Sequence, residues 1–196
     1  MKNKFRASFS VLNAWAKGDW ERAVEMYFKL DDFTNQAMEE GKEWHKKWEN
    51  EIENTSCLPE VFGGARLEKP KTELKLEFQL ADWLELVGVV DCYDVEGDVY
   101  EFKTGHSSSQ SYANSMQTRI YGLLLKLHKQ KVRKAIIHRY NQHSKKADCS
   151  YLWLTSEQLK NALDWVHTFS SEMHNYLEEN DLYKELGNKN KEKISK

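Results

Sequence analysis

Two carboxylates and a lysine lie inside what is otherwise the most apolar stretch of the sequence. Asp91 ends the run GVVD, and Glu101 and Lys103 flank Phe102 in the run YEFKTG. Carboxylate oxygens beside a cation form a hard, anionic site, and Mg²⁺ or Mn²⁺ prefers such oxygens together with those of a phosphate group. A purely structural ion pair between Lys103 and one of the carboxylates is the alternative interpretation.

The turn between the two charged strands decides whether these three side chains share a face. Residues 96 to 98, Glu-Gly-Asp, predict a three-residue hairpin loop, because Gly97 can adopt the left-handed conformation that such loops favour. That loop would place Asp91 opposite Lys103, and Glu101 points the same way as Lys103. An even-length loop would turn Asp91 to the other face.

The elements around these strands alternate between helical and extended patterns. Apolar residues recur at helical spacing through much of residues 1–53, which therefore predict an N-terminal helical segment. Strict alternation of apolar and charged residues predicts a strand near 74–80. Thr155 and Gln158 form a capping-box pattern that predicts the start of a helix. Further strands are expected at 83–93, 99–104, 135–140 and 150–154, and a further helix at 111–129.

This order of elements predicts an α/β (α+β) fold with a mixed β-sheet flanked by helices. The 196 residues predict a single domain over 1–186, with its core at 73–177. The low-complexity segment 187–196 predicts a disordered basic tail.

Three cysteines without a CxxC pair favour reduced thiols. The sequence has no apolar run that resembles a signal peptide or a membrane span, so we expect a soluble, cytoplasmic protein without a membrane partner.

Residues 102 to 147 contain no Asp or Glu, but they contain ten Lys or Arg. A block with this bias predicts a polyanionic partner such as nucleic acid. The alternative is an ordinary solvated basic surface. The residues predicted to bind nucleic acid are Arg119, Lys126, Lys129, Lys131, Arg133, Lys134 and Arg139.

The charged motif also resembles a known family. GVVD followed by YEFKTG is similar to the GxxD…(D/E)xKTG pattern of RecB-like nucleases, a branch of the PD-(D/E)XK nuclease superfamily. The helix expected next contains Gln117 and Tyr121 in the branch's QxxxY pattern, and an upstream helix contains the run GKEWH, which ends at His45. The matches occur in order between residues 8 and 125, and they imply a restriction-endonuclease-like core.

The resemblance implies a role for each matching residue. Lys103 would be the catalytic lysine. Gln117 and Tyr121, one helical turn apart, would position the scissile phosphate or order Lys103. Glu77 on the preceding strand could reach the site through a water molecule. The metal ligands that the resemblance implies are His45, Asp91, Glu101 and the backbone carbonyl of Phe102, with Asp91 and Glu101 also counted as catalytic.

We therefore expect a metal-dependent nuclease that hydrolyses DNA phosphodiester bonds, in the first place a DNA exonuclease of the recombination, repair or phage type. Its DNA would be single-stranded or offer duplex ends. A structure-specific endonuclease and a non-catalytic nucleic-acid-binding subunit that keeps the fold are the alternatives.

Some relatives hold an iron–sulfur cluster with four cysteines. No cysteine follows Cys149 here, so no cluster is expected. No helicase motif is present, so a helicase or recombination partner would be a separate chain.

Overall fold

The computed structural model describes residues 3–30, 36–105 and 107–186. They belong to two compact units, each built from separate stretches of the chain. Unit 1 comprises Met1–Phe33, Glu77–Val87 and Leu163–Lys196, and unit 2 comprises Thr34–Leu76 and Gly88–Ala162. The single domain expected over 1–186 stays a prediction. The tail expected to be disordered, 187–196, lies outside the described residues.

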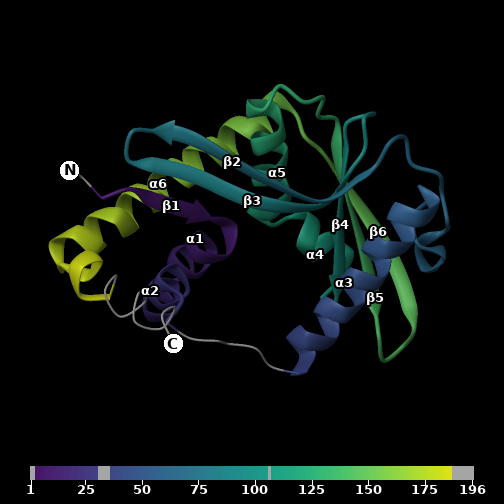
Figure 1. The fold of residues 1–196 in the computed structure, drawn as a ribbon, viewed down its shortest axis with the longest axis horizontal. Coiled ribbons are helices and arrows are strands. Elements are labelled where there is room, and N and C mark those ends of the chain that lie inside the picture. The colour runs from purple at the N-terminus through teal and green to yellow at the C-terminus, as the bar shows by residue number, and fades with distance from the viewer. Residues whose placement is uncertain (1–2, 31–35, 106, 187–196) are drawn as a thin grey trace. The chain divides into compact units, whose positions relative to one another are not determined.

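Unit 1 contains a short strand that the helical pattern had hidden. Its complete elements are β1 (Phe5–Ser8), α1 (Phe9–Ala16) and α2 (Trp20–Phe28) (Figure 1). β1 runs parallel to β3, from Phe5 opposite Leu84 to Ser8 opposite Val87. The prediction of an entirely helical segment over 1–53 is therefore wrong at Phe5–Ser8. Four residues are too few for a periodic signal, and the pairing partner lies far along the chain.

Three elements continue from one unit into the other. These are β2 (Lys71–Ala81), β3 (Leu84–Tyr93) and α6 (Ser156–Glu179). Gln158 donates its backbone N–H to the Thr155 hydroxyl at 3.3 Å, which confirms the predicted start of α6.

Unit 2 holds the charged strands. Its complete elements are α3 (Gln36–Thr55), the 3₁₀ turn η1 (Glu60–Phe62), β4 (Asp98–Thr104), α4 (Ser109–Ala113), α5 (Met116–Leu127), β5 (Lys134–Asn141) and β6 (Lys146–Trp153). The helix expected at 111–129 is thus two helices, α4 and α5. β4 pairs in parallel with β5, whereas β3–β4 and β5–β6 are antiparallel.

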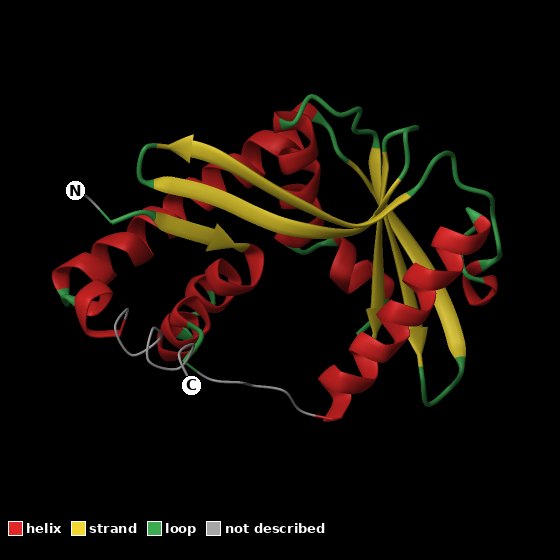
Figure 2. Cartoon of the chain, in the orientation of Figure 1, coloured by secondary structure: helices red, strands yellow, loops and turns green. Residues whose placement is uncertain are grey.

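The strands are paired in the order β1-β3-β4-β5-β6, with β2 paired to β3. Figure 2 shows β5 and β6 as a hairpin. The predicted mixed sheet flanked by helices is confirmed.

The core of unit 2 fixes which face of β4 carries the charges. Tyr100 and Phe102 are buried in one apolar cluster with Trp48 and Ile52 of α3. Because side chains alternate along a strand, Glu101 and Lys103 point away from this cluster. None of the helices in the described ranges is both long enough and apolar enough to cross a membrane.

Candidate active site

The hairpin between β3 and β4 differs from its predicted register but keeps its predicted parity. The pairs are Cys92 with Tyr100 and Tyr93 with Val99, so residues 94 to 97 connect the two strands instead of residues 96 to 98. Asp91 is therefore not opposite Lys103, as the sequence predicted. The shift equals two residues, so Asp91 remains on the face that carries the other two charges.

Asp94 is the physical reason for the longer turn. Its carboxylate accepts hydrogen bonds from the backbone N–H of Asp98 and from the hydroxyl of Tyr100, both at 3.1 Å. Its own N–H donates to the Asp98 carbonyl at 3.1 Å. Gly97 has a φ of +95°, which confirms the left-handed conformation expected there.

Asp91 connects the two strands to α3. Its Oδ2 accepts a hydrogen bond from the backbone N–H of Phe102 at 2.7 Å and lies 3.8 Å from Nδ1 of His45. The Phe102 backbone also lies near enough to the His45 imidazole to act on its pKa in the upward direction. The structure thus brings together three of the four residues predicted to bind metal.

Glu101 and Lys103 form an ion pair on the same face of β4. The Lys103 ammonium donates to Oε1 of Glu101, whose side chain is only 1% exposed. Oε2 of Glu101 is buried and has no hydrogen-bond partner among the described residues. A buried carboxylate oxygen without a donor is costly unless a cation or another donor satisfies it.

A third carboxylate joins the site from β2, and it is not the one predicted. His45, Glu73 and Asp91 each offer a donor atom within 4.8 Å of the others, so they could hold a metal ion. Glu101 stands outside this group. Glu77, which the sequence suggested, belongs to unit 1 and forms an ion pair with Arg6.

Glu73 has a conformation that supports a special role. Its φ is +45°, in the left-handed region that a residue with a side chain rarely adopts. Such backbone strain costs on the order of 1–3 kcal/mol and tends to occur at functional positions. No sequence pattern reveals that Glu73 belongs to the site, because strand alternation makes Glu73 and Glu77 equivalent.

The electrostatics of the site suit a bound cation. Burial raises the pKa of Asp91 to about 6. Burial and the nearby Asp91 charge raise the pKa of Glu101 to about 7. Burial lowers the pKa of His45, so its imidazole is neutral and can act as a ligand. The carboxylates of Asp91 and the exposed Glu73, together with the His45 imidazole, therefore fit Mg²⁺ or Mn²⁺, whose charge would offset the repulsion between Asp91 and Glu101.

The raised carboxyl pKa values predict a pH-dependent stability in EDTA. The ordinary values are 3.8 for Asp91 and 4.5 for Glu101, so both groups hold their protons more tightly in the folded state. Their contribution to stability is complete below the ordinary values and is lost as pH rises through 6 to 7. We expect the melting temperature to fall between pH 5 and pH 8. Glu101→Gln should flatten this profile in thermal unfolding, and identical profiles for the two proteins would contradict the assignment.

Gln117 and Tyr121 lie in α5, as the sequence predicted. Gln117 Nε2 donates to the Tyr121 hydroxyl at 2.9 Å. Burial and the Glu101 charge raise the pKa of Tyr121, so its phenol stays protonated and can donate a hydrogen bond. Gly88 allows α5 to approach, since a Cβ there would lie 2.9 Å from Leu124 and 3.1 Å from the Tyr121 ring.

A cavity of about 1080 Å³ lies in front of these residues. Its lining includes His45, Glu73, Asp91, Lys103 and Tyr121. Every one of them belongs to unit 2. The cavity gives a substrate direct access to the possible metal ligands and to the lysine.

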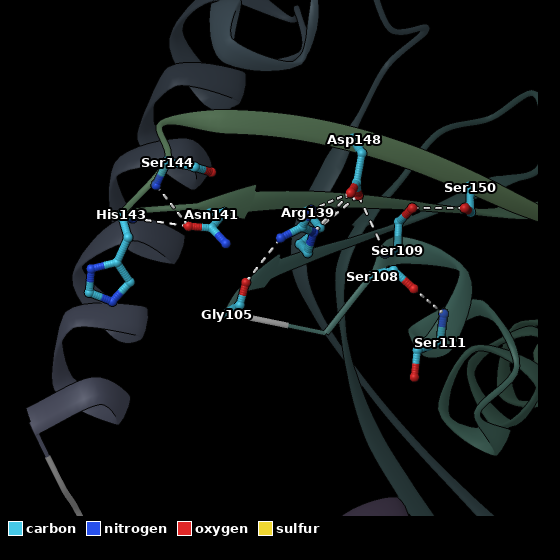
Figure 3. Close-up of polar contacts among 10 residues, drawn as sticks. All are labelled: Gly105, Ser108, Ser109, Ser111, Arg139, Asn141, His143, Ser144, Asp148 and Ser150. Atoms are coloured by element: carbon cyan, nitrogen blue, oxygen red, sulfur yellow. Dashed lines mark hydrogen bonds and ion pairs between the residues drawn. The ribbon is translucent and has the colours of Figure 1, made fainter.

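A polar network contacts Gly105 and the start of α4 (Figure 3). Arg139 forms an ion pair with Asp148 and donates to the Gly105 carbonyl at 3.2 Å. Asp148 also accepts the backbone N–H of Ser109, the first residue of α4, at 3.3 Å. The network therefore ties α4 to β5 and β6. Tyr112 of α4 in turn lies with its ring centroid 5.8 Å from the Lys103 ammonium.

Removing the acid of this network should destabilise the fold. Asp148→Ala removes the carboxylate that accepts from Arg139 and from the Ser109 N–H, and Arg139 keeps only the Gly105 carbonyl. We expect the free energy of unfolding, measured with urea, to decrease by about 1–2 kcal/mol. This is the low end of the range for hydrogen bonds to charged groups, because Asp148 is partly exposed. Asp164→Ala, an exposed acid on α6, should change stability by less than about 0.5 kcal/mol. Equal losses in the two variants would contradict a role for the network.

Most of the seven cations predicted to bind nucleic acid already have partners. Arg133 and Lys134 pair with Asp98, Lys131 pairs with Glu96, Arg139 pairs with Asp148, and Arg119 donates to Gln158 and to three backbone carbonyls. Lys126 and Lys129 are exposed and form no ion pair within the described ranges. As far as the structure describes the chain, none of the seven lines the cavity. Their nucleic-acid role stays a prediction.

Comparison with protein families agrees with the fold and the motif. The family model of the PD-(D/E)XK nuclease superfamily matches residues 5–185, so the chain belongs to this superfamily. It is thus a PD-(D/E)XK nuclease, as the motifs implied. The chain has no significant match among curated proteins.

Solved structures show the same fold at low sequence identity. An alkaline exonuclease from Laribacter hongkongensis matches with a TM-score of 0.57 and 10% identity, over 90% of this chain and 93% of that one. Its complex with dAMP matches with a TM-score of 0.58 and 11% identity, over 93% of each chain. A protein from Eubacterium rectale, provisionally named an exonuclease, matches with a TM-score of 0.59 and 14% identity, over 89% and 82%.

Proposed function

We propose that this protein is a deoxyribonuclease that depends on a divalent metal ion and removes nucleotides from DNA ends. One observation carries the proposal. His45, Glu73 and Asp91 lie within mutual reach of one cation, in the cavity that Lys103 also lines. Carboxylates, an imidazole and an ammonium group in one cavity are suited to hydrolysis of a phosphodiester.

The residues of the chain would divide the chemistry among them. A divalent cation held by His45, Glu73 and Asp91 would supply positive charge and a water of lowered pKa. Lys103, oriented by Glu101, would hold the attacking water and neutralise charge that develops on the phosphate. Tyr121, whose hydroxyl accepts from Gln117, would donate to a phosphate oxygen.

The pKa of Lys103 depends on two opposing effects. Burial would lower the Lys103 pKa, but the carboxylates of Glu101 and Asp91 raise it. Lys103 therefore remains an ammonium near neutral pH. We infer that it acts as a cation and hydrogen-bond donor rather than as a general base.

The preference for ends rests on the structural relatives. One of them is named an alkaline exonuclease and has been solved with dAMP. A mononucleotide is the product expected when a nuclease works inward from an end. The same relatives support DNA as the substrate of this chain.

The decisive experiment uses end-labelled linear DNA and covalently closed circles, single- and double-stranded, with matched RNA. Each is incubated with Mg²⁺, with Mn²⁺ or with EDTA. We expect release of mononucleotides from linear DNA in either metal and no product in EDTA. Cleavage of closed circles would show that the activity is endonucleolytic and would contradict the proposed exonuclease activity. Intact substrates under every condition would leave only a nucleic-acid-binding role.

A further inference from the structure

The cations that face the cavity come from a part of the sequence that composition did not single out. Besides Lys103, the cavity is lined by Lys42 and Lys46 of α3 and by Lys75 of β2. All three lie outside residues 102–147, the stretch without acids. The lining therefore has its own basic groups, separate from the basic surface that the sequence predicted.

Lys75 differs from the two lysines of α3 in having no partner among the described residues. Lys42 pairs with Glu39 and Lys46 pairs with Glu49, each at 2.7 Å within one turn of the helix. The Lys75 side chain is exposed and forms no ion pair or hydrogen bond with any residue that the structure describes. Its full charge is thus available to a ligand in the cavity.

The position of Lys75 places that charge beside the possible metal ligands. It follows Glu73 by two residues on the same strand, and both side chains line the cavity. The lining carries four lysines and the three carboxylates Glu49, Glu73 and Asp91, and two of the lysines, Lys42 and Lys103, pair with Glu39 and Glu101 outside it. A divalent cation at the His45 group would tip this balance toward positive charge, so an anion would then be the electrostatic complement of the cavity.

We propose that Lys75 binds a backbone phosphate of the substrate strand next to the scissile bond, with Lys42 and Lys46 of α3 as weaker contributors. This inference deepens the proposed nuclease function and rests on it for the identity of the ligand. A phosphate contact of this kind provides affinity and register without reading the base sequence.

Salt dependence is the measurement that isolates one phosphate contact. Each phosphate neutralised by a lysine adds about 0.7 to the slope of log affinity against log salt for single strands and about 0.9 for duplex DNA. We would measure binding of labelled oligonucleotides by fluorescence anisotropy in EDTA, between 50 and 200 mM KCl. The variants are Lys75→Ala, Lys75→Arg and Lys71→Ala.

Lys71→Ala is the matched control because Lys71 is an exposed lysine of the same strand that does not line the cavity. It removes the same charge from the protein. We expect Lys75→Ala to reduce the slope by the amount that belongs to one phosphate contact. The ratio of wild-type affinity to Lys75→Ala affinity should therefore decrease by roughly threefold between 50 and 200 mM KCl. Lys71→Ala should keep the wild-type slope, and Lys75→Arg should restore it.

The outcomes separate this inference from the proposed function. A wild-type slope for Lys75→Ala, or an equal loss for Lys71→Ala, overturns the role of Lys75 even if the protein cleaves DNA. A slope that depends on Lys75, in a protein that cleaves nothing in Mg²⁺ or Mn²⁺, supports the phosphate contact and refutes the nuclease proposal. With active protein, Lys75→Ala should raise KM more than it lowers kcat.

Discussion

Lys103→Met is expected to lower the rate of DNA cleavage by about 10²–10³-fold, the usual effect of removing one group that stabilises charge in a transition state. Methionine keeps most of the length of the side chain but removes the ammonium that pairs with Glu101. Single-turnover cleavage of end-labelled DNA in Mg²⁺ measures the effect. Lys103→Arg should recover little, since a planar guanidinium cannot replace a compact ammonium in this partly buried position.

The stability of the Lys103→Met variant serves as its control. Removing one partner of a buried pair is costly when the other stays charged. Here Glu101 has a raised pKa, near 7, so it can take up a proton instead. We expect a folded variant at pH 6, which circular dichroism can verify. A folded variant with wild-type cleavage would exclude Lys103 from the chemistry.

Asp91→Asn is expected to abolish metal binding and to reduce cleavage by at least about 10²-fold, because charge stabilisation by a metal ion contributes several kcal/mol. The amide oxygen can still accept the N–H of Phe102, so the contact between the strands should survive. Calorimetric titration with Mn²⁺ measures the affinity directly, without reference to activity.

Asp94→Asn provides a matched comparison for this variant. Asp94 is a buried carboxylate of the same hairpin, but it does not line the cavity. It should retain the affinity for Mn²⁺. If both variants bind Mn²⁺ as the wild type does, the cluster around His45 is not the metal site.

Local sequence was sufficient to predict the charged face of β4. Asp91, Glu101 and Lys103 lie within one hairpin, and the side-chain period of two survives any shift of register by two residues. The register was wrong because Asp94 closes the turn through its own carboxylate. The pairing of Gln117 with Tyr121 was equally predictable from local sequence, since positions four apart on a helix share a face.

Local sequence does not predict which residues meet through pairing between distant parts of the chain. Alternation along β2 could not distinguish Glu73 from Glu77, because it does not say where a strand bends or which unit each residue joins. The same limit hid β1, whose four residues form a strand only because β3 lies beside them.

The sequence alone determined the superfamily and the chemical character of the site, because its motif residues are neighbours within single elements. Only the tertiary structure decided which cations are free to meet a substrate. Counting charges along the chain made residues 102–147 look basic throughout. Folding brings Asp98 and Asp148, which flank that stretch, against its arginines, and leaves Lys75 of a distant strand facing the cavity. Electrostatic partners are set by distance in space, and sheet pairing makes that independent of distance along the chain.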